Sequence, residues 1–538
     1  MTRRPAPRAR RFLPTLTLVA ATAFAAAVPA KTLVYCSEGS PENFSPALNT
    51  TGTSFDAARP VFDQLTAFER GSTKVVPGLA ESWVVAPDGK TITFHLRKGV
   101  KFHSGVNGFK PTREFNADDV LFSFERQWKP EHPYAKVSGG KYDFFADMSM
   151  PKLLKSIAKV DDHTVRFELN EPDTTLLADL AMDFASIVSA EYADFLARQG
   201  RKEQFDQIPV GTGAFQFVVY QKDAVIRFHR NADYWGEKAK VDDLVYAITP
   251  DATARYSKLK AGECHLAISP RPSDLPEMQK DPALKIVSQA GLNIAYWAFN
   301  TKKPPFDKKE VRQAFSMAID KAALIRDVYQ GAGQAAKNLI PPTMWSYNDK
   351  VVDYPYDPAK AKALLAKAGV KTPLTIDLWY MPVQRPYNPN AKRIAEMMQS
   401  DLAKIGVTAT LVTYEWGEYR KRLQQGEHTT AQMGWTGDNG DPDNFFFLHS
   451  CEAARPGGPN LSKWCDKEFD DKLAKAKTLT DPAARTRLYM EMQVIEHEEA
   501  PDMKIGHSTV YEAMRAEVSG YKQSPLGRHQ FNGVDIAK

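Results

Sequence analysis

Apolar and polar positions alternate in short runs through the first half of the chain. Ile92, Phe94 and Leu96 occupy every second position of one such run, as expected for a strand with one buried face. The segment Thr32–Cys36 has the composition of another strand. The pattern predicts a strand-rich region from residue 31 to about residue 249.

A helical period replaces this alternation beyond residue 290. From Val311 to Val328, apolar residues recur every three or four positions, which predicts a helix that ends before Gly331. Another helix is expected to begin at Asp357 and Pro358 and to end at Gly369, because proline favours the first turn and glycine the position after the last.

Strands and helices then alternate along one continuous segment. Strands are expected at 374–380, 408–414 and 431–435, and helices at 390–405 and 416–425. This order predicts parallel strands joined by crossover helices. In open sheets of this kind, ligands bind beyond the carboxyl ends of the strands.

Two opposite charges follow strands of this run. Arg385 and Asp438 each lie just past the end of a predicted strand, so both are expected at one rim of the sheet. The loop Trp435–Asn444 is rich in turn-forming residues, which an exposed connection would also use. The joint placement with Arg385 favours a binding site for a ligand that carries an ammonium and a carboxylate. A small peptide is such a ligand.

Patterns of catalytic chemistry are incomplete in this sequence. His497-Glu498-Glu499-Ala500-Pro501 is not a zinc-protease helix, because the second histidine is missing and proline would break it. Ser257 and Lys260 have the spacing of an acylating pair, but its companion elements are absent. We therefore expect no catalytic residue, no metal, no cofactor and no enzymatic activity.

The first 30 residues have the features of a secretory signal. Five arginines precede residue 12, an apolar stretch follows, and small residues end it at Ala30, so cleavage is expected before Lys31. An uncleaved anchor is the alternative, although the stretch is short and Pro14 interrupts it. Export by the general or the twin-arginine route stays open. We expect a periplasmic protein.

The charge balance excludes some classes of partner. Five of the 70 basic residues are the arginines of this leader, so the remaining basic residues match the 65 acidic ones. A neutral chain does not favour nucleic acid or an anionic membrane surface as partner. The length predicts two or three domains.

Four cysteines, all beyond the leader, suggest two disulfides in an oxidising compartment. Three pairings are possible. We favour Cys451 with Cys465, which closes a local loop, and Cys36 with Cys264. A zinc site that includes His449 is the alternative, but no pair of cysteines has the short spacing typical of one.

Five segments carry a resemblance to a known family. They are Lys31–Ser40, Val76–Glu81, Leu339–Trp345, Met381–Asn390 and Met433–Phe445. Together they resemble the bacterial periplasmic dipeptide-binding proteins of ABC importers, within the peptide/nickel solute-binding family. The last two segments resemble the dipeptide branch, whereas the residues between Cys451 and Cys465 depart from it.

The resemblance implies an α/β fold of the two-lobed periplasmic-binding-protein type (type II), with mixed sheets joined by a hinge of two chain crossings. The hinge is expected near Phe299–Thr301 and Ile505–Ser508. The expected division is a signal peptide at 1–30, lobe I at 31–298 with an inserted subdomain at about 80–208, lobe II at 299–506, and a return to lobe I at 507–538.

The resemblance also assigns roles. Asp438 would bind the peptide amine and Arg385 its carboxylate, and Gly52 would hold the peptide backbone from lobe I. The other expected binding residues are Tyr387, Trp435, Thr436 and Gly437. The same two disulfides are implied.

The implied function is capture of dipeptides by a monomer and their delivery to an inner-membrane ABC permease, with contact to a chemoreceptor left open. Longer peptides, haem or 5-aminolevulinate are alternative ligands. A periplasmic peptidase or penicillin-recognising hydrolase is the alternative from another class.

Overall fold

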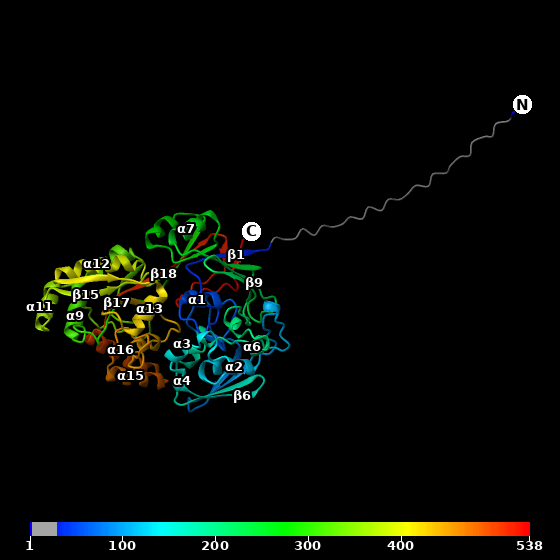
Figure 1. The fold of residues 1–538 in the computed structure, drawn as a ribbon, viewed down its shortest axis with the longest axis horizontal. Coiled ribbons are helices and arrows are strands. Elements are labelled where there is room, and N and C mark those ends of the chain that lie inside the picture. The colour runs from blue at the N-terminus through cyan, green and yellow to red at the C-terminus, as the bar shows by residue number, and fades with distance from the viewer. Residues whose placement is uncertain (3–29, 538) are drawn as a thin grey trace.

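The computed structural model describes residues 1–2 and 30–537, so the expected signal peptide lies almost wholly outside the described residues. Figure 1 shows two bodies side by side: one carries α1 to α7, and the other carries α9 to α16. We call them lobe I and lobe II. Within the described part of the chain, no helix is both long and apolar enough to span a bilayer.

Lobe I is built on a mixed sheet around β1. Strand β1 (Thr32–Ser37) pairs in parallel with β10 (Asp243–Ile248) and β11 (Leu266–Ile268). Its other strands are β8 (Phe215–Gln221), β9 (Val225–Arg230) and β12 (Leu284–Ala290), and its helices include α1 (Gly52–Ala58), α5 (Leu176–Asp179), α7 (Ala252–Ala261) and α8 (Leu275–Met278). Lobe I also contains two separate two-stranded sheets, formed by β2 (Thr66–Phe68) with β3 (Val75–Pro77) and by β19 (Val518–Ser519) with β20 (Asp535–Ile536).

A separate antiparallel sheet lies in the part of lobe I expected to hold an inserted subdomain. Its strand order is β4-β5-β7-β6. The strands are β4 (Ala80–Val85), β5 (Thr91–Leu96), β6 (Leu154–Asp161) and β7 (Thr164–Leu169), with helices α2 (Ala117–Trp128), α3 (Asp143–Asp147), α4 (Met150–Leu153) and α6 (Ala190–Arg198). Ile92, Phe94 and Leu96 of β5 are buried, and the residues between them are not, as the alternation predicts.

Lobe II contains the strand–helix run. Strand β15 (Leu374–Trp379) lies between β16 (Val407–Val412) and β17 (Thr430–Thr436) and is parallel to both. Helices α12 (Ala391–Lys404) and α13 (Trp416–Gln425) connect them. The predicted strands and helices of this run are confirmed to within two residues at each end. A short strand, β14 (Gly333–Ala335), pairs with β18 (Asp502–Arg515).

The other helices of lobe II pack around this sheet. They are α9 (Lys309–Ala318), α10 (Lys321–Leu324), α11 (Pro358–Lys367), α14 (Asp443–Phe446), α15 (Lys467–Thr478) and α16 (Pro482–Glu499). Helix α11 begins as predicted, because the Asp357 side chain accepts a hydrogen bond from the Lys360 N–H.

The single helix expected from Val311 to Val328 is wrong. Helix α9 ends at Ala318, and Ile319 is extended. The Asp320 side chain then accepts from the Ala323 N–H and begins α10, which continues into a π-helical turn. A capping residue within the apolar stripe therefore divides one predicted helix into two.

The lobes are joined where two neighbouring strands change partners. Residues 502–506 of β18 pair with β13 (Asn293–Phe299), and residues 509–515 pair with β12. The Asn293 Nδ2 donates to Ser508 Oγ over 2.9 Å, and the Ser508 N–H donates to Asn293 Oδ1 over 2.9 Å. We place the two crossings at residues 291–292 and 507–508.

The hinge segment expected near Phe299–Thr301 is therefore wrong. Phe299 pairs with Thr430 at the far end of β13, well within lobe II. The segment expected near Ile505–Ser508 does contain the second crossing. The apolar run before residue 300 was sufficient to predict a strand but not to predict its partner.

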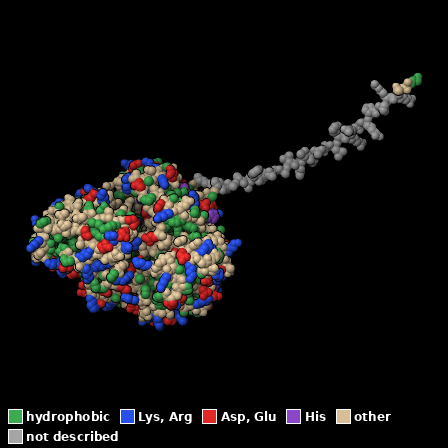
Figure 2. Space-filling view, viewed as in Figure 1, with side chains coloured by type: hydrophobic (Ala, Val, Ile, Leu, Met, Phe, Trp, Pro, Cys, Tyr) green, Lys and Arg blue, Asp and Glu red, His purple; other side chains and the backbone are tan. Residues whose placement is uncertain are grey.

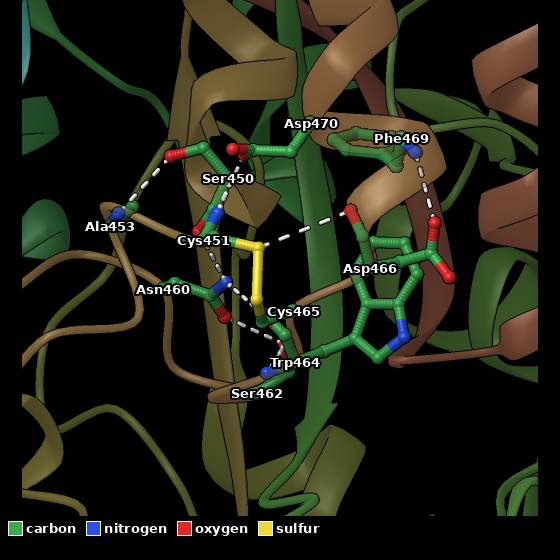
Figure 3. Close-up of a disulfide and its surroundings, with 10 residues drawn as sticks. All are labelled: Ser450, Cys451, Ala453, Asn460, Ser462, Trp464, Cys465, Asp466, Phe469 and Asp470. Carbon is green, nitrogen blue, oxygen red and sulfur yellow. Dashed lines mark hydrogen bonds between the residues drawn. A yellow bond between two sulfur atoms is a disulfide. The ribbon is translucent and has the colours of Figure 1, made fainter.

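Each lobe contains one disulfide. Cys36 pairs with Cys264 and ties β1 to the chain before β11. Cys451 pairs with Cys465 and closes a loop in lobe II (Figure 3). Asn460 donates to the carbonyls of Ser450 and Trp464 across this loop, and the Cys451 N–H donates to Asp470 of α15. The disulfide loop, residues 451–465, is thus fixed to the body of lobe II.

Candidate functional site

A cavity of about 230 Å³ lies between the two lobes. Lobe I contributes Glu38, the start of α1, Phe144 on α3 and His529, whereas lobe II contributes Arg385, the start of α13 and the end of β17. Figure 1 shows α13 facing α1 and α3 across the boundary between the lobes. On the face shown in Figure 2, acidic and basic side chains are interspersed.

Asp438 is a buried acid whose charge the surrounding protein compensates only in part. It follows β17 by two residues, and its backbone N–H donates to Asn444 Oδ1 over 2.8 Å. Its Oδ2 is buried without a hydrogen-bond partner among the described residues. Burial raises the pKa of Asp438 to about 7, although Arg528 opposes this rise. A cation that entered the cavity here would stabilise the ionised carboxylate.

The aromatic wall beside Asp438 is formed by Trp435. Its Nε1 donates to the same Asn444 oxygen over 3.0 Å. Its ring stacks on Phe144 of lobe I, with centroids 6.2 Å apart, and meets Phe447 edge-on at 5.4 Å. Trp435 therefore joins the two lobes through apolar contact next to the buried carboxylate.

Tyr387 lies against the strand that leads to Asp438. A Cβ at Gly434 would lie 2.3 Å from the Tyr387 ring, so only glycine fits beneath it. The Tyr329 hydroxyl donates to the Tyr387 carbonyl over 2.7 Å. Tyr387 and Thr436 both line the cavity. Gly437, which was expected at the site, is not among the lining residues, and its N–H donates to Leu292 O over 2.7 Å.

Arg385 lies at the same edge of the sheet, in the loop after β15. Its backbone forms two hydrogen bonds with that of Asn388. Its guanidinium lies 5.0 Å from the centre of the Trp416 ring and 3.7 Å from Glu38 Oε1 of lobe I. The distance to Glu38 is too long for a direct hydrogen bond, so the donors of Arg385 stay available to an anion.

A second arginine shares the same aromatic ring. The Arg420 guanidinium lies 5.9 Å from the centre of Trp416 and donates to Thr50 Oγ1 of lobe I over 2.7 Å. It also lies 3.5 Å from Glu42. This end of the cavity therefore holds two cations, each near a glutamate of the opposite lobe.

Gly52 lines the cavity at the first turn of α1. A Cβ at this position would have no atom of the other described residues within 4 Å, so the space in front of the backbone is open. The Thr51 side chain caps the helix by accepting from the Ser54 N–H. The arrangement leaves room for an extended backbone to approach lobe I.

The wall of the cavity next to the hinge contains a buried ion triad. His529 contacts Asp56 Oδ2 at 2.7 Å and Glu512 Oε1 at 2.9 Å through its two nitrogens. Burial disfavours its protonation, but the two carboxylates outweigh that effect and raise the pKa of His529 well above its usual value. The imidazole is thus fixed as a cation between two acids and is not available as a metal ligand.

Further contacts cross between the lobes around the cavity. Asn439, next to Asp438, donates to Asp179 of lobe I over 2.7 Å. The disulfide loop makes two ion pairs with lobe I, from Glu452 to Lys152 and from Arg455 to Asp147, both at 2.8 Å. We call these two ion pairs the loop clasp, because they join the disulfide loop of lobe II to lobe I, and Asp147 of the second pair also lines the cavity.

One group of side chains has the spacing of a metal site. Within the described residues, this group is His449, Glu496 and Asp502. Lys504 lies among them, with its Nζ 2.7 Å from Glu496 and in contact with Asp502. The two acids balance Lys504 and His449, whose pKa is raised to about 9 by these carboxylates against the effect of burial. The charges balance without an ion, and none of the four lines the cavity.

The site also contains residues that the sequence analysis missed. Trp416 and Arg420 follow β16, and Glu38 follows β1. The rule that located Arg385 and Asp438, namely a polar or aromatic residue just past a strand, would also have found these. Phe144 and His529 carry no comparable signal, because they reach the cavity from the inserted subdomain and the C-terminal return.

Comparisons with known proteins agree with this architecture. A model of the family described as "Bacterial extracellular solute-binding proteins, family 5 Middle" matches residues 74–455. The chain is 56% identical to the dipeptide-binding protein of Escherichia coli (strain K12), over 97% of each chain. It is 51% identical to heme-binding protein A of Haemophilus influenzae, over 94% of this chain and 92% of that protein.

A solved structure is similar over nearly the whole fold. The dipeptide-binding protein from Pseudoalteromonas sp. SM9913, in complex with Met-Leu, has a TM-score of 0.90 and 39% sequence identity. The match covers 94% of this chain and 100% of that one. The expected α/β two-lobed fold is thereby confirmed.

Proposed function

The chain belongs to family 5 of the bacterial extracellular solute-binding proteins, and on this premise we propose that it captures dipeptides in the periplasm and delivers them to an ABC permease for import. It is a solute-binding protein rather than an enzyme. In this role the expected signal peptide is removed before Lys31, and the mature protein acts as a monomer.

The observation that carries the proposal is the opposite charge at the two ends of one cavity. Asp438 is buried, and one of its carboxylate oxygens has no hydrogen-bond partner in the part of the chain that the structure describes. Arg385 and Arg420 line the other end. A dipeptide zwitterion supplies an ammonium for the first and a carboxylate for the second, so each buried charge acquires a partner. Two extended residues span roughly 7 Å, and a fixed separation of the two charges would make binding depend on the length of the peptide.

Binding between the two lobes would change the arrangement of the lobes. Peptide bound between Arg385 and Asp438 of lobe II would also contact Gly52 of lobe I, so it would favour the closed arrangement over the open one. The closed form is then the form that a permease recognises, and opening releases the peptide. The two crossings at residues 291–292 and 507–508 are the positions about which the lobes would rotate.

Calorimetry with a panel of ligands tests this function. Protein freed of bound ligand by unfolding and refolding is titrated with Ala-Leu, Ala-Leu-Ala and a tetrapeptide, and with Ala-Leu that is acetylated or amidated. We expect tight binding of Ala-Leu and a loss of about 100-fold or more on acetylation, because Asp438 would be left buried without a cation. Equal affinity for the tetrapeptide and Ala-Leu would contradict selection by length.

Haem is the alternative ligand, since a relative that is 51% identical is named a heme-binding protein. Among the described residues that line the cavity, His529 is the one histidine, and both its nitrogens are held by carboxylates. Haem iron would therefore find no free imidazole there. A haem titration followed by the Soret band, with Ala-Leu as competitor, separates the two ligands.

A further inference from the structure

Asn444 holds together the two residues that form one end of the cavity. It lies on α14, six positions after Asp438, and is completely buried. Its Oδ1 accepts from the Asp438 backbone N–H at 2.8 Å and from Trp435 Nε1 at 3.0 Å. One oxygen thus fixes the loop that carries the carboxylate and the ring that flanks it.

The amide nitrogen of Asn444 has no such partner. Its Nδ2 is buried without a hydrogen bond among the described residues, as is Asp438 Oδ2. Buried polar groups are nearly always paired in folded proteins, so an unpaired donor and an unpaired acceptor in one loop require an explanation. The Asn444 side chain is still close enough to the carboxyl group to lower the pKa of Asp438 by a polar contact that falls short of hydrogen-bond geometry, against the larger effect of burial. Asn444 therefore favours the ionised carboxylate.

We propose that Asn444 is a positioning residue for recognition of the ligand amine. Its oxygen orients Asp438 and Trp435, and its amide group supports the ionised carboxylate when the ammonium of the ligand enters. The inference rests on the proposed function, because it takes Asp438 as the group that meets the amine. Asn444 itself need not touch the ligand.

An amide is the side chain that suits both tasks. Aspartate at position 444 would keep an acceptor for the Asp438 N–H and for Trp435 but would place a second negative charge beside Asp438. Like charges oppose ionisation, so Asn444→Asp should make the protein require a higher pH to bind an amine. Alanine would remove the acceptor and free both Trp435 and the loop.

The test uses the full mature protein with Asn444→Asp, Asn444→Ala and a matched control. Asn348→Ala is the control, since Asn348 is also buried in lobe II and forms hydrogen bonds with backbone groups, but is not among the residues that line the cavity. Affinity for Ala-Leu is measured by calorimetry from pH 5.5 to 8.5, and thermal unfolding is measured in parallel.

We expect Asn444→Asp to lower affinity at pH 7 at least tenfold and to move the midpoint of the pH profile upward by about one unit. Asn444→Ala should lower affinity at every pH, whereas Asn348→Ala should lower the unfolding temperature without changing either quantity. A folded Asn444→Asp protein with the wild-type affinity and midpoint would overturn the proposal.

A measurement on the wild-type protein covers the case in which the variants fail to fold. In ¹⁵N-labelled protein, addition of Ala-Leu should shift the NMR signals of the Asn444 side-chain amide and slow its hydrogen exchange with water. Addition of acetylated Ala-Leu should do neither. An identical response to both ligands would overturn the proposal. If no dipeptide binds at all, the proposed function fails. The positioning role is then decided by titrating the Asp438 carboxyl group in the ligand-free wild type and in Asn444→Asp, where the pKa of Asp438 should be higher in the variant.

Discussion

The two ends of the cavity carry opposite charges and differ in how the protein balances them. At one end, Asp438 has a buried oxygen that accepts no hydrogen bond from residues 30–537. At the other, Arg385 and Arg420 share the Trp416 ring, and each lies near a glutamate of lobe I. The anionic end is a single group held firmly by Asn444, whereas the cationic end is a pair of groups that already has counter-charges.

This difference predicts that the protein discriminates more strongly at the amine of the ligand than at its carboxylate. A ligand without an ammonium leaves Asp438 buried with only the incomplete compensation that Arg528 provides. A ligand without a carboxylate leaves Arg385 near Glu38, which continues to balance part of its charge. Recognition should therefore be strict for the amine and more tolerant for the carboxylate.

The largest effect is expected from Asp438→Asn, which keeps the shape of the side chain and removes its charge. Affinity for Ala-Leu should fall by about 100-fold or more, since loss of one partner from a buried pair costs about 3–5 kcal/mol. Calorimetry at pH 7.5 measures this loss. A variant that retains affinity within about threefold of wild type would contradict the role of Asp438.

The same substitution should stabilise the ligand-free protein. The pKa of Asp438 is raised by burial to about 7, so the folded protein binds this proton more tightly than the unfolded chain does. The contribution of Asp438 to stability is then present at low pH and is lost as the pH rises from about 4 to about 7. Asn carries no charge, so the unfolding temperature at pH 8 should rise by roughly 1–4 °C.

Arg385→Met is expected to have a smaller effect, because Arg420 still supplies a cation at that end. Affinity for Ala-Leu should fall by about tenfold, in line with about 1.5 kcal/mol for a hydrogen bond to a charged group. Removing Glu38 as well, in Arg385→Met with Glu38→Gln, should recover part of the loss. A loss greater than that of Asp438→Asn would reverse the comparison of the two ends.

The pH dependence of binding should arise at the anionic end. Below the pKa of about 7, the free protein carries a proton on Asp438 that an ammonium must displace. Affinity should therefore fall between pH 8 and pH 5.5, by at most tenfold for each unit below the pKa. Asp438→Asn should flatten the profile, and a profile that stays steep in this variant would assign the pH dependence to another group.

The smallest effect is expected from the loop clasp. Lys152→Gln with Arg455→Gln removes two partly exposed ion pairs between the lobes, and pairs of this kind contribute at most about 1 kcal/mol each. Affinity should fall by about two- to fivefold for every dipeptide, and more at low salt. Lys472→Gln, which removes two ion pairs within lobe II, is the control and should leave affinity unchanged.

Much of lobe II and of the site could be predicted from the sequence, because local patterns determine it. Strands β15 to β17 and the two helices between them follow from periodicity and capping, and their carboxyl ends must share one edge. That edge carries Arg385 and Asp438. Trp416, Arg420 and Glu38 follow the same rule and were still missed.

The position of the hinge and the contribution of lobe I to the cavity depend on contacts between segments that are distant in the sequence. The pattern of residues 293–299 predicts a strand but not that its partner is β17, so the hinge was expected seven residues too late. Phe144 reaches the cavity only because the inserted subdomain packs against Trp435. Such long-range pairings leave no periodic signal in a single sequence.

A cycle of two proteins and two ligands tests the central claim most directly. Wild type and Asp438→Asn are each titrated with Ala-Leu and with acetylated Ala-Leu in a calorimeter at pH 7.5. If Asp438 meets the amine, wild type should prefer the free amine by about 100-fold or more, and the variant should prefer it by less than about threefold. An undiminished preference in the variant would show that the amine is bound elsewhere.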